Sequence, residues 1–223
     1  MFTKLQLVQA SYDSRMKRET RWLSVIASQK QTSTPLENIA RVLSAKLQQE
    51  WQRSVAKHCK IVGLPTTRND RVPRARNVGQ AFIKESTRLQ KCITTTMKLL
   101  QESDVTSLKF DNRVKSITIT SMTAVRTAGA LDVLDSHRSS QVVRSRLVKL
   151  YGKPGARFAK EWFTMRDELV CSHCDELDGV VVNAYNGVFS SDQFGDVEGP
   201  PLHPNCRCEI LVSKRYTKKR KRK

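Results

Sequence analysis

Apolar residues recur at three- and four-residue steps through much of the first 140 residues, which is the pattern of amphipathic helices. The clearest stripe follows Pro35, a residue suited to a first helical turn, and predicts a helix ending near Lys60. Thr34 and Glu37 have the spacing of a capping box at its start. The apolar face of this helix comprises Leu36, Ile39, Ala40, Leu43, Leu47, Trp51 and Val55.

Related patterns predict four more helical regions. A weaker one surrounds Trp22, a long helix fits residues 77–101, a third region fits 105–138, and a shorter helix fits 140–151. We expect the third region to break or kink near Ser116–Thr120, because its Ile-Thr-Ile-Thr run is locally strand-like.

After Gly155 the pattern changes to short apolar runs separated by glycines and prolines. The runs at residues 158–165, 180–182 and 209–212 predict three strands. The fold class is therefore predicted as α+β. We expect a predominantly helical N-terminal region and a small, loop-rich C-terminal unit of a few strands.

The excess of basic residues indicates what kind of partner the protein binds. The 223 residues carry 40 Lys and Arg against 21 Asp and Glu, a net charge of +19. Residues 1–100 carry +13 and residues 201–223 carry +8, whereas residues 151–200 carry −5. The excess indicates a polyanionic partner such as double-stranded DNA, but the acidic stretch is unlike a uniformly basic nucleic-acid module.

The last ten residues hold eight of these cations. Such a run repels itself and buries no apolar area, so we expect a disordered basic tail at 214–223 that contacts DNA phosphates. A solubilising role and nuclear localisation are alternatives that fit the same residues. The predicted DNA-binding side chains are Lys214, Arg215, Lys218, Lys219, Arg220, Lys221, Arg222 and Lys223.

Several classes of protein are not expected. No stretch of about 18 apolar residues occurs, so the sequence predicts no membrane-spanning segment. The first residues lack the features of a secretory signal, so we expect a protein that stays where it is made or travels inside an assembled particle. No nucleotide-binding glycine motif or nucleophile elbow is present, and no small-molecule substrate is expected.

Four of the six cysteines lie near the C-terminus together with a histidine, in the pattern C-x2-C, 28 residues, then H-x2-C-x-C. Zinc favours four sulfur or nitrogen ligands at tetrahedral corners, and two such turns can close one site. We predict a structural zinc site made of Cys171, Cys174, His203 and Cys206, with Cys208 as the alternative for the last position. Protein ligands would fill all four positions and leave none for a reactive water.

Two other interpretations of these cysteines remain open, namely disulfide bonds within each pair and reduced thiols without metal. Cys59 and Cys92 lie on or near apolar helix faces, so we expect them to act as small buried hydrophobic residues. His173 falls inside the first turn, and its side chain should point away from the pair.

The C-terminal residues resemble the phage Mu F-like family, also described as minor head or phage head morphogenesis proteins. The likeness rests on a strand with Trp162, a block from Asp167 to Gly179 that contains the first Cys pair, and a closing Pro-Pro-Leu-His-Pro-Asn-Cys-Arg-Cys from Pro200 to Cys208. An upstream Arg126-Thr127 pair also fits, and the likeness covers about residues 110–212.

The resemblance implies a non-enzymatic minor capsid protein of a tailed phage or prophage. Such proteins act in head assembly near the portal or capsid interior, and some aid DNA packaging or ejection. We therefore expect the portal, other head proteins and double-stranded DNA as partners, and the virion, or the host cytoplasm during assembly, as the location. The expected division is a helical, basic region 1–104, a Mu F-like domain 105–213 and the tail.

Two charged positions near the Cys motifs suit supporting roles. Asp167 can cap the turn that enters the first motif, and Arg207 can pair with an acidic residue of the 167–178 block. Plain surface charge explains either residue equally well.

The main rival predictions are a zinc-stabilised DNA-binding protein and an HNH-type nuclease. The nuclease needs a histidine beside an acidic metal ligand, and the sequence has no Asp-His or Glu-His pair. His58 and His137 stand alone on predicted helices, where surface or core positions explain them better.

Overall fold

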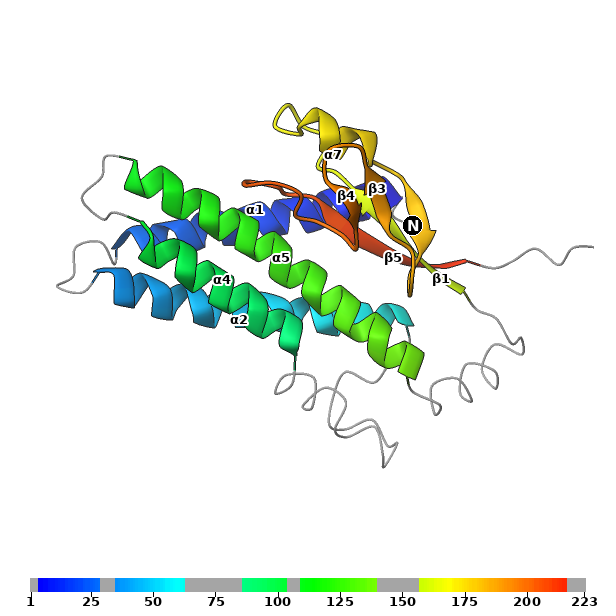
Figure 1. Cartoon of the computed structure of the whole chain (residues 1–223), viewed down its shortest axis with the longest axis horizontal. Coiled ribbons are helices and arrows are strands. Elements are labelled where there is room, and N and C mark those ends of the chain that lie inside the picture. The colour runs from blue at the N-terminus through cyan, green and yellow to red at the C-terminus, as the bar shows by residue number, and fades with distance from the viewer. Residues whose placement is uncertain (1–3, 29–34, 63–85, 104–108, 140–156, 216–223) are drawn as a thin grey trace, which may run out of the picture.

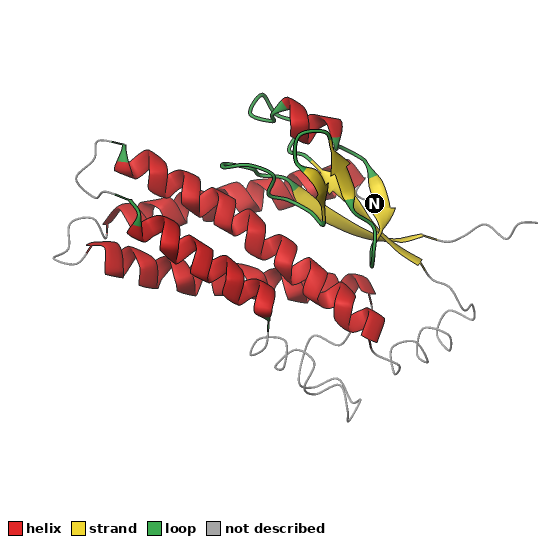
Figure 2. Cartoon of the chain, in the orientation of Figure 1, coloured by secondary structure: helices red, strands yellow, loops and turns green. Residues whose placement is uncertain are grey.

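Four long helices form the larger part of the molecule, and a small antiparallel sheet region lies over one part of them (Figure 1, Figure 2). The computed structural model describes residues 4–28, 35–62, 86–103, 109–139 and 157–215. The predicted α+β class is confirmed. The helices are α1 (Lys4–Ser28), α2 (Pro35–Val62), α4 (Thr87–Gln101) and α5 (Phe110–Ser139).

The central helices α2 and α5 pack along much of their length, and α4 packs against both. The apolar stripe predicted for α2 is confirmed, because Ile39, Leu43, Leu47, Trp51 and Val55 are buried and Leu36 and Ala40 are partly buried against them. The two helices lie close together at Gly129, where a Cβ atom would be 2.8 Å from the Ser54 Cβ and 3.0 Å from the Trp51 carbonyl oxygen. Glycine therefore sets the distance between α2 and α5.

The predicted break near Ser116–Thr120 is wrong, since α5 runs unbroken through this segment. The Thr118 and Thr120 hydroxyls donate to carbonyl oxygens one turn earlier, at 2.8 Å each. Ile117 and Ile119 are buried. Burial and these local bonds outweigh the strand preference of β-branched residues.

Helix α4 begins ten residues later than the start predicted at residue 77. Ser86 is its N-cap, with Oγ accepting from the Leu89 amide at 3.0 Å and donating to Asp132 at 2.6 Å. This cap fixes the helix start and ties it to α5. Residues 77–85, the predicted helix 140–151 and the predicted Thr34 cap lie outside the described residues.

The sheet region confirms the three predicted strands and adds a hairpin. β1 (Arg157–Phe163) lies between β2 (Val181–Asn183) and β5 (Glu209–Arg215), antiparallel to both. The hairpin pairs β3 (Phe189–Ser191) with β4 (Gly195–Val197). The run of three valines predicts β2, whereas β3 and β4 have only one large apolar residue each and give no apolar run in the sequence.

Two hydrophobic cores result. The larger one joins all four long helices to the sheet through Phe158, Ile210 and Val212. It crosses residue 104, where the sequence analysis placed a domain boundary, and that boundary stays a prediction. The smaller core consists of Trp162, Cys174, Leu177, Phe189, Cys206 and Cys208.

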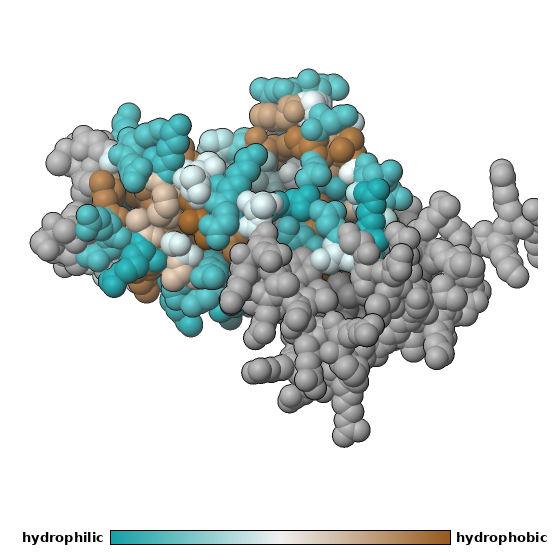
Figure 3. All heavy atoms as spheres, turned by 60° about the horizontal axis from the view of Figure 1, so that its bottom comes forward, coloured by the Kyte–Doolittle hydropathy of each residue, from teal (hydrophilic) through white to brown (hydrophobic). Residues whose placement is uncertain are grey.

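Polar side chains cover much of the described face in Figure 3, with apolar patches between them. Among the residues that the structure describes, the most exposed large apolar side chain is Leu169, which precedes Val170 at the edge of the smaller core. Among the helices the structure describes, none is both long enough and apolar enough to cross a membrane.

Candidate metal centre

The first Cys pair lies where the chain enters the short helix α7 (Ser172–Glu176). Cys171 is the N-cap, and its sulfur accepts a hydrogen bond from the Cys174 amide at 3.4 Å. This turn brings two sulfurs from neighbouring backbone positions to the same side, as the C-x2-C spacing predicts. Cys174 is buried and Cys171 is half-buried.

The second turn carries His203 and Cys206. The Cys206 amide donates to the His203 carbonyl at 3.2 Å, which closes the turn. Asn205 adopts a left-handed conformation with φ of 64°, which asparagine tolerates better than most residues. Its amide donates to Thr120 Oγ1 at 2.8 Å and so attaches the turn to α5.

The two turns bring their side chains together. His203 Nε2 lies 3.0 Å from Cys171 Sγ and 3.2 Å from Cys174 Sγ, and the sulfurs of Cys174 and Cys206 are 3.9 Å apart. Cys208 joins the cluster, with its sulfur within 4.8 Å of those of Cys174 and Cys206. The five sequence-predicted candidates therefore form two adjacent groups of possible ligands that share Cys174. One group is Cys171, Cys174 and His203, the other is Cys174, Cys206 and Cys208, and either can hold a metal ion.

One sulfur–sulfur distance and the orientation of the histidine suit a tetrahedral ion. Two thiolates bound at 2.3 Å at tetrahedral angles lie about 3.8 Å apart, close to the separation of Cys174 and Cys206. His203 Nδ1 lies 2.7 Å from the Pro204 carbonyl oxygen and donates to it. This bond leaves Nε2, the nitrogen that faces the sulfurs, as a free lone pair for a metal.

The sulfurs also stabilise negative charge on one another. Hydrogen bonds from Cys174 and then Cys208 lower the pKa of Cys206 to about 2. Cys174 shares its hydrogen bond with Cys206, and this raises the pKa of Cys174. A thiolate is thus favoured at Cys206, which is the form that binds metal.

Residues of the helical layer hold the second turn from behind. Thr123 Oγ1 donates to the Cys206 carbonyl at 2.6 Å and accepts from Arg15 at 2.8 Å. The second terminal nitrogen of Arg15, Nη1, donates to the Arg207 carbonyl at 2.5 Å. The cluster is therefore attached to both α1 and α5.

The supporting roles proposed for Asp167 and Arg207 are confirmed. Asp167 Oδ1 accepts from the Leu169 amide at 3.2 Å, at the turn that leads to the first Cys pair. The same oxygen accepts from Arg207 Nη2 at 2.7 Å. This ion pair connects the first turn to the second.

The remaining cysteines and His173 lie apart from the cluster. All six cysteines are free thiols. Cys59 is buried and Cys92 half-buried, and burial raises the pKa of each to about 11. The His173 ring lies edge-on to the Phe194 ring, with the ring centroids 5.7 Å apart. His173 belongs to neither group of possible metal ligands.

The predicted DNA-binding residues are described only in part. Lys214 and Arg215 form the end of β5, where they pair with Phe158 and Arg157 of β1. Their strand backbone differs from the disorder expected for the whole tail. The other six lie outside the described residues, namely Lys218, Lys219, Arg220, Lys221, Arg222 and Lys223.

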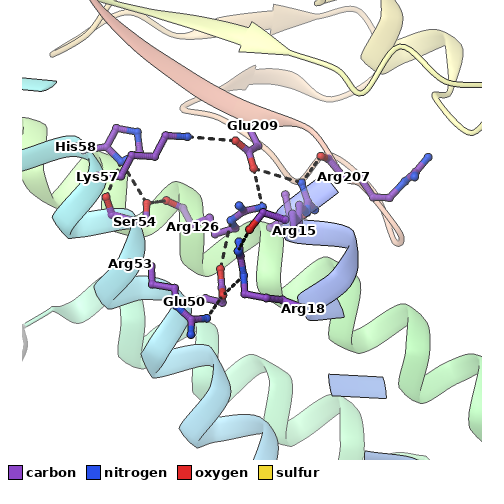
Figure 4. Close-up of polar contacts among 12 residues, drawn as sticks. Arg15, Arg18, Glu50, Arg53, Ser54, Lys57, His58, Arg126, Arg207 and Glu209 are labelled. Atoms are coloured by element: carbon purple, nitrogen blue, oxygen red, sulfur yellow. Dashed lines mark hydrogen bonds and ion pairs between the residues drawn. The ribbon is translucent and has the colours of Figure 1, made fainter. Parts of the chain in front are cut away.

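A partly buried group of charged residues next to the metal centre was not predicted from the sequence (Figure 4). We call it the charged cluster: Arg15, Arg18, Glu50, Arg53, Lys57, Arg126 and Glu209. One signal for it exists in the sequence. Glu50 lies three residues after Leu47, on the apolar face of α2, where a solvated carboxylate has no place.

A scan of protein-family models and searches of curated proteins and of solved structures found no match to this chain. The Mu F-like resemblance therefore stays a prediction that rests on the residues quoted for it.

Proposed function

We propose that the Cys/His cluster binds one zinc ion whose role is structural. The observation that carries this proposal is that four cysteines and one histidine form two groups of possible metal ligands that share Cys174. Thiolate and imidazole ligands favour zinc over magnesium or calcium, which prefer oxygen. The ligands are Cys171, Cys174, His203 and Cys206, with Cys208 as the alternative to Cys206.

The ion's role is to join the two turns. It supplies bonds that the smaller core lacks, since that core has only six buried residues and three of them are cysteines. Four protein side chains fill the four positions around the ion, and Cys208 lies beside them as a fifth candidate. No position is therefore left for a reactive water. The contacts from Thr123 and Arg15 orient the second turn before the ion binds.

At the level of the whole protein, we propose a non-enzymatic minor head protein of a tailed phage or prophage. The residues that carry the Mu F-like resemblance are the ones that build and brace the cluster, including Trp162 and Arg207. The net charge of +19 suits a protein near packaged DNA. Its proposed partners are the portal, other head proteins and double-stranded DNA.

Mass spectrometry of purified particles tests this role directly. Particles of the phage or induced prophage that encodes the chain are separated into DNA-filled heads, empty heads and soluble protein. The proposal predicts a few copies of the chain in the filled heads. Its presence in the soluble fraction alone would contradict the proposal.

DNA binding by the tail has its own test. A chain that ends at Arg215 keeps β5 whole but loses six cations, so the salt dependence of duplex binding should weaken by up to about 5 in log-log slope. An unchanged slope would remove DNA binding from the tail. Cleavage of the duplex in the presence of zinc, magnesium or manganese would favour the nuclease alternative.

A further inference from the structure

In the charged cluster, cations outnumber carboxylates, so each carboxylate contacts several cations (Figure 4). Glu209 lies at the start of β5, with Oε1 2.6 Å from Arg126 and 3.7 Å from Arg15. Its Oε2 lies 3.5 Å from Lys57 Nζ. One carboxylate on the sheet therefore faces three cations from three helices.

Glu50, on α2, repeats this arrangement. Its Oε1 lies 2.5 Å from Arg53 and 3.0 Å from Arg18, and its Oε2 lies 3.5 Å from Arg126. Arg126 is thus placed between the two carboxylates. Glu50 is 1% exposed, so water screens these charges weakly.

The charges do not balance among the described residues. Five cations of α1, α2 and α5 stand against Glu50, Glu209 and the buried Glu19, which attracts Arg15. Two positive charges are left in excess. Burial and then repulsion by Arg126 lower the pKa of Arg15 to about 10, as expected for an incompletely neutralised cation.

A recess opens beside this excess charge. It has a volume of about 180 Å³ and lies between α2, α5 and β5. Arg53 and Lys57 are 51% and 42% exposed at its rim, whereas Arg126 is 15% exposed further in. Since a water occupies about 30 Å³ in the liquid, the recess has room for several waters or one small anion.

His58 also lines the recess. Its Nδ1 donates to the Ser54 carbonyl at 2.7 Å, so the other ring nitrogen, Nε2, is a hydrogen-bond acceptor. The arginines and Lys57, and not His58, therefore supply the donors of the recess.

We propose that this recess binds a small phosphate-class oxyanion. The guanidinium groups of Arg18, Arg53 and Arg126 offer planar donor pairs, which match the oxygens of such an ion. A dianion would cancel the two excess charges. The site lies beside the metal centre, which it meets at Cys208, but no residue of the charged cluster is a proposed zinc ligand.

The geometry favours a free ion over the backbone of a DNA duplex. The deepest donor, Arg126, and its partner Glu50 are enclosed by α2, α5 and β5. A duplex would meet Arg53 and Lys57 first, since they are the most exposed of the lining cations, whereas Arg126 is 15% exposed. The basic tail, which is distant in sequence, remains the proposed DNA-binding segment.

The test is calorimetric titration of inorganic phosphate into the full chain at constant ionic strength. The pocket variant is Arg53→Gln with Lys57→Gln, which replaces the two cations at the rim, 51% and 42% exposed, by neutral side chains. The matched control is Arg41→Gln with Lys60→Gln, which removes the same charge from exposed positions of the same helix.

We expect saturable binding of one phosphate per chain, weakened at least tenfold in the pocket variant and unchanged in the control. Equal weakening in both variants, or no saturation, would overturn the proposal. Adding a saturating DNA duplex distinguishes the source of the ligand. Phosphate binding that persists assigns the recess to the free ion, and displacement that depends on Arg53 and Lys57 assigns it to the phosphates of the DNA.

Discussion

The helical layer and the C-terminal unit are stabilised by different means. The helical layer consists of α1, α2, α4 and α5. Helix α2 by itself contributes an apolar stripe in which Ile39, Leu43, Leu47 and Trp51 are 0–1% exposed. The C-terminal unit has two small sheets and a core of six buried residues, half of them cysteines. The first region can fold by apolar burial, whereas the second depends on what its cysteines bind.

The two regions contact each other through β5, which makes both apolar and charged contacts with the helices. Ile210 and Val212 of β5 join the larger core, while Glu209 on the same strand enters the charged cluster. Arg15 connects that cluster to the second Cys turn through Arg207 and Thr123. Metal loss should therefore loosen the C-terminal unit first and leave α2, α4 and α5 packed together.

Replacing Cys174 should have the largest effect. Its sulfur belongs to both groups of possible metal ligands, so Cys174→Ser removes a ligand whichever of Cys206 and Cys208 completes the site. Structural zinc contributes about 10–16 kcal/mol in small zinc-binding peptides, so the C-terminal unit should lose its fold. Hydrogen exchange should show fast exchange across residues 157–215 and retained protection in α2 and α5.

The matched control is Cys92→Ser, which makes the same atomic change on the half-buried face of α4, outside the cluster. It should leave the exchange of residues 157–215 unchanged. Loss of protection throughout the chain in Cys174→Ser would show that the two regions fold as one.

Leu43→Ala should destabilise the helical layer and leave the metal site unchanged, the reverse of Cys174→Ser. Leu43 is completely buried in the helical layer, and the cavity left by its truncation should lower the free energy of unfolding by about 2–5 kcal/mol. Denaturant unfolding followed by far-ultraviolet circular dichroism measures this loss. Zinc affinity in the absence of denaturant should stay the same, and a weakened affinity would contradict the separation of the two regions.

His58 should make the helical layer sensitive to acid. Burial and then the charge of Lys57 lower the pKa of His58 from 6.5 to about 4. As the pH falls below 6.5, the unfolded chain takes up a proton that folded His58 resists until about pH 4. Stability present above pH 6.5 is therefore lost between pH 6.5 and 4, by up to about 3 kcal/mol.

The comparison with His58→Gln isolates this contribution, because protonation of the metal ligands affects both proteins equally. The difference in unfolding free energy, wild type minus variant, should fall as the pH drops from 7 to 4. A difference that does not change with pH would show that His58 has no such role.

The smallest effect should come from the ion pair between the two Cys turns. Asp167→Asn keeps the shape but weakens the 2.7 Å contact with Arg207, and Asp167 is 28% exposed. We expect a loss of about 1 kcal/mol or less in the unfolding of the C-terminal unit. A loss above that of Leu43→Ala would mean that the ion pair, and not the metal, joins the two turns.

The sequence predicted the regions that have a clear period or spacing. The α2 stripe, the three principal strands and the grouping of the five Cys and His candidates all follow from such patterns. The unbroken course of α5 could not be predicted, because Thr118 and its neighbours favour strands locally and become helical through burial. The charged cluster was also missed, since most partners of Glu50 and Glu209, including Arg126, come from segments distant in the sequence.

Metal content of the purified, reduced chain tests the central claim most directly, with Cys171→Ser, Cys206→Ser and Cys208→Ser measured beside Cys92→Ser. The account predicts about one zinc per chain in the wild type, Cys208→Ser and Cys92→Ser. It predicts that Cys171→Ser and Cys206→Ser lose the zinc together with the fold of residues 157–215. Absence of metal from a wild type that is as well folded as every variant would contradict the account.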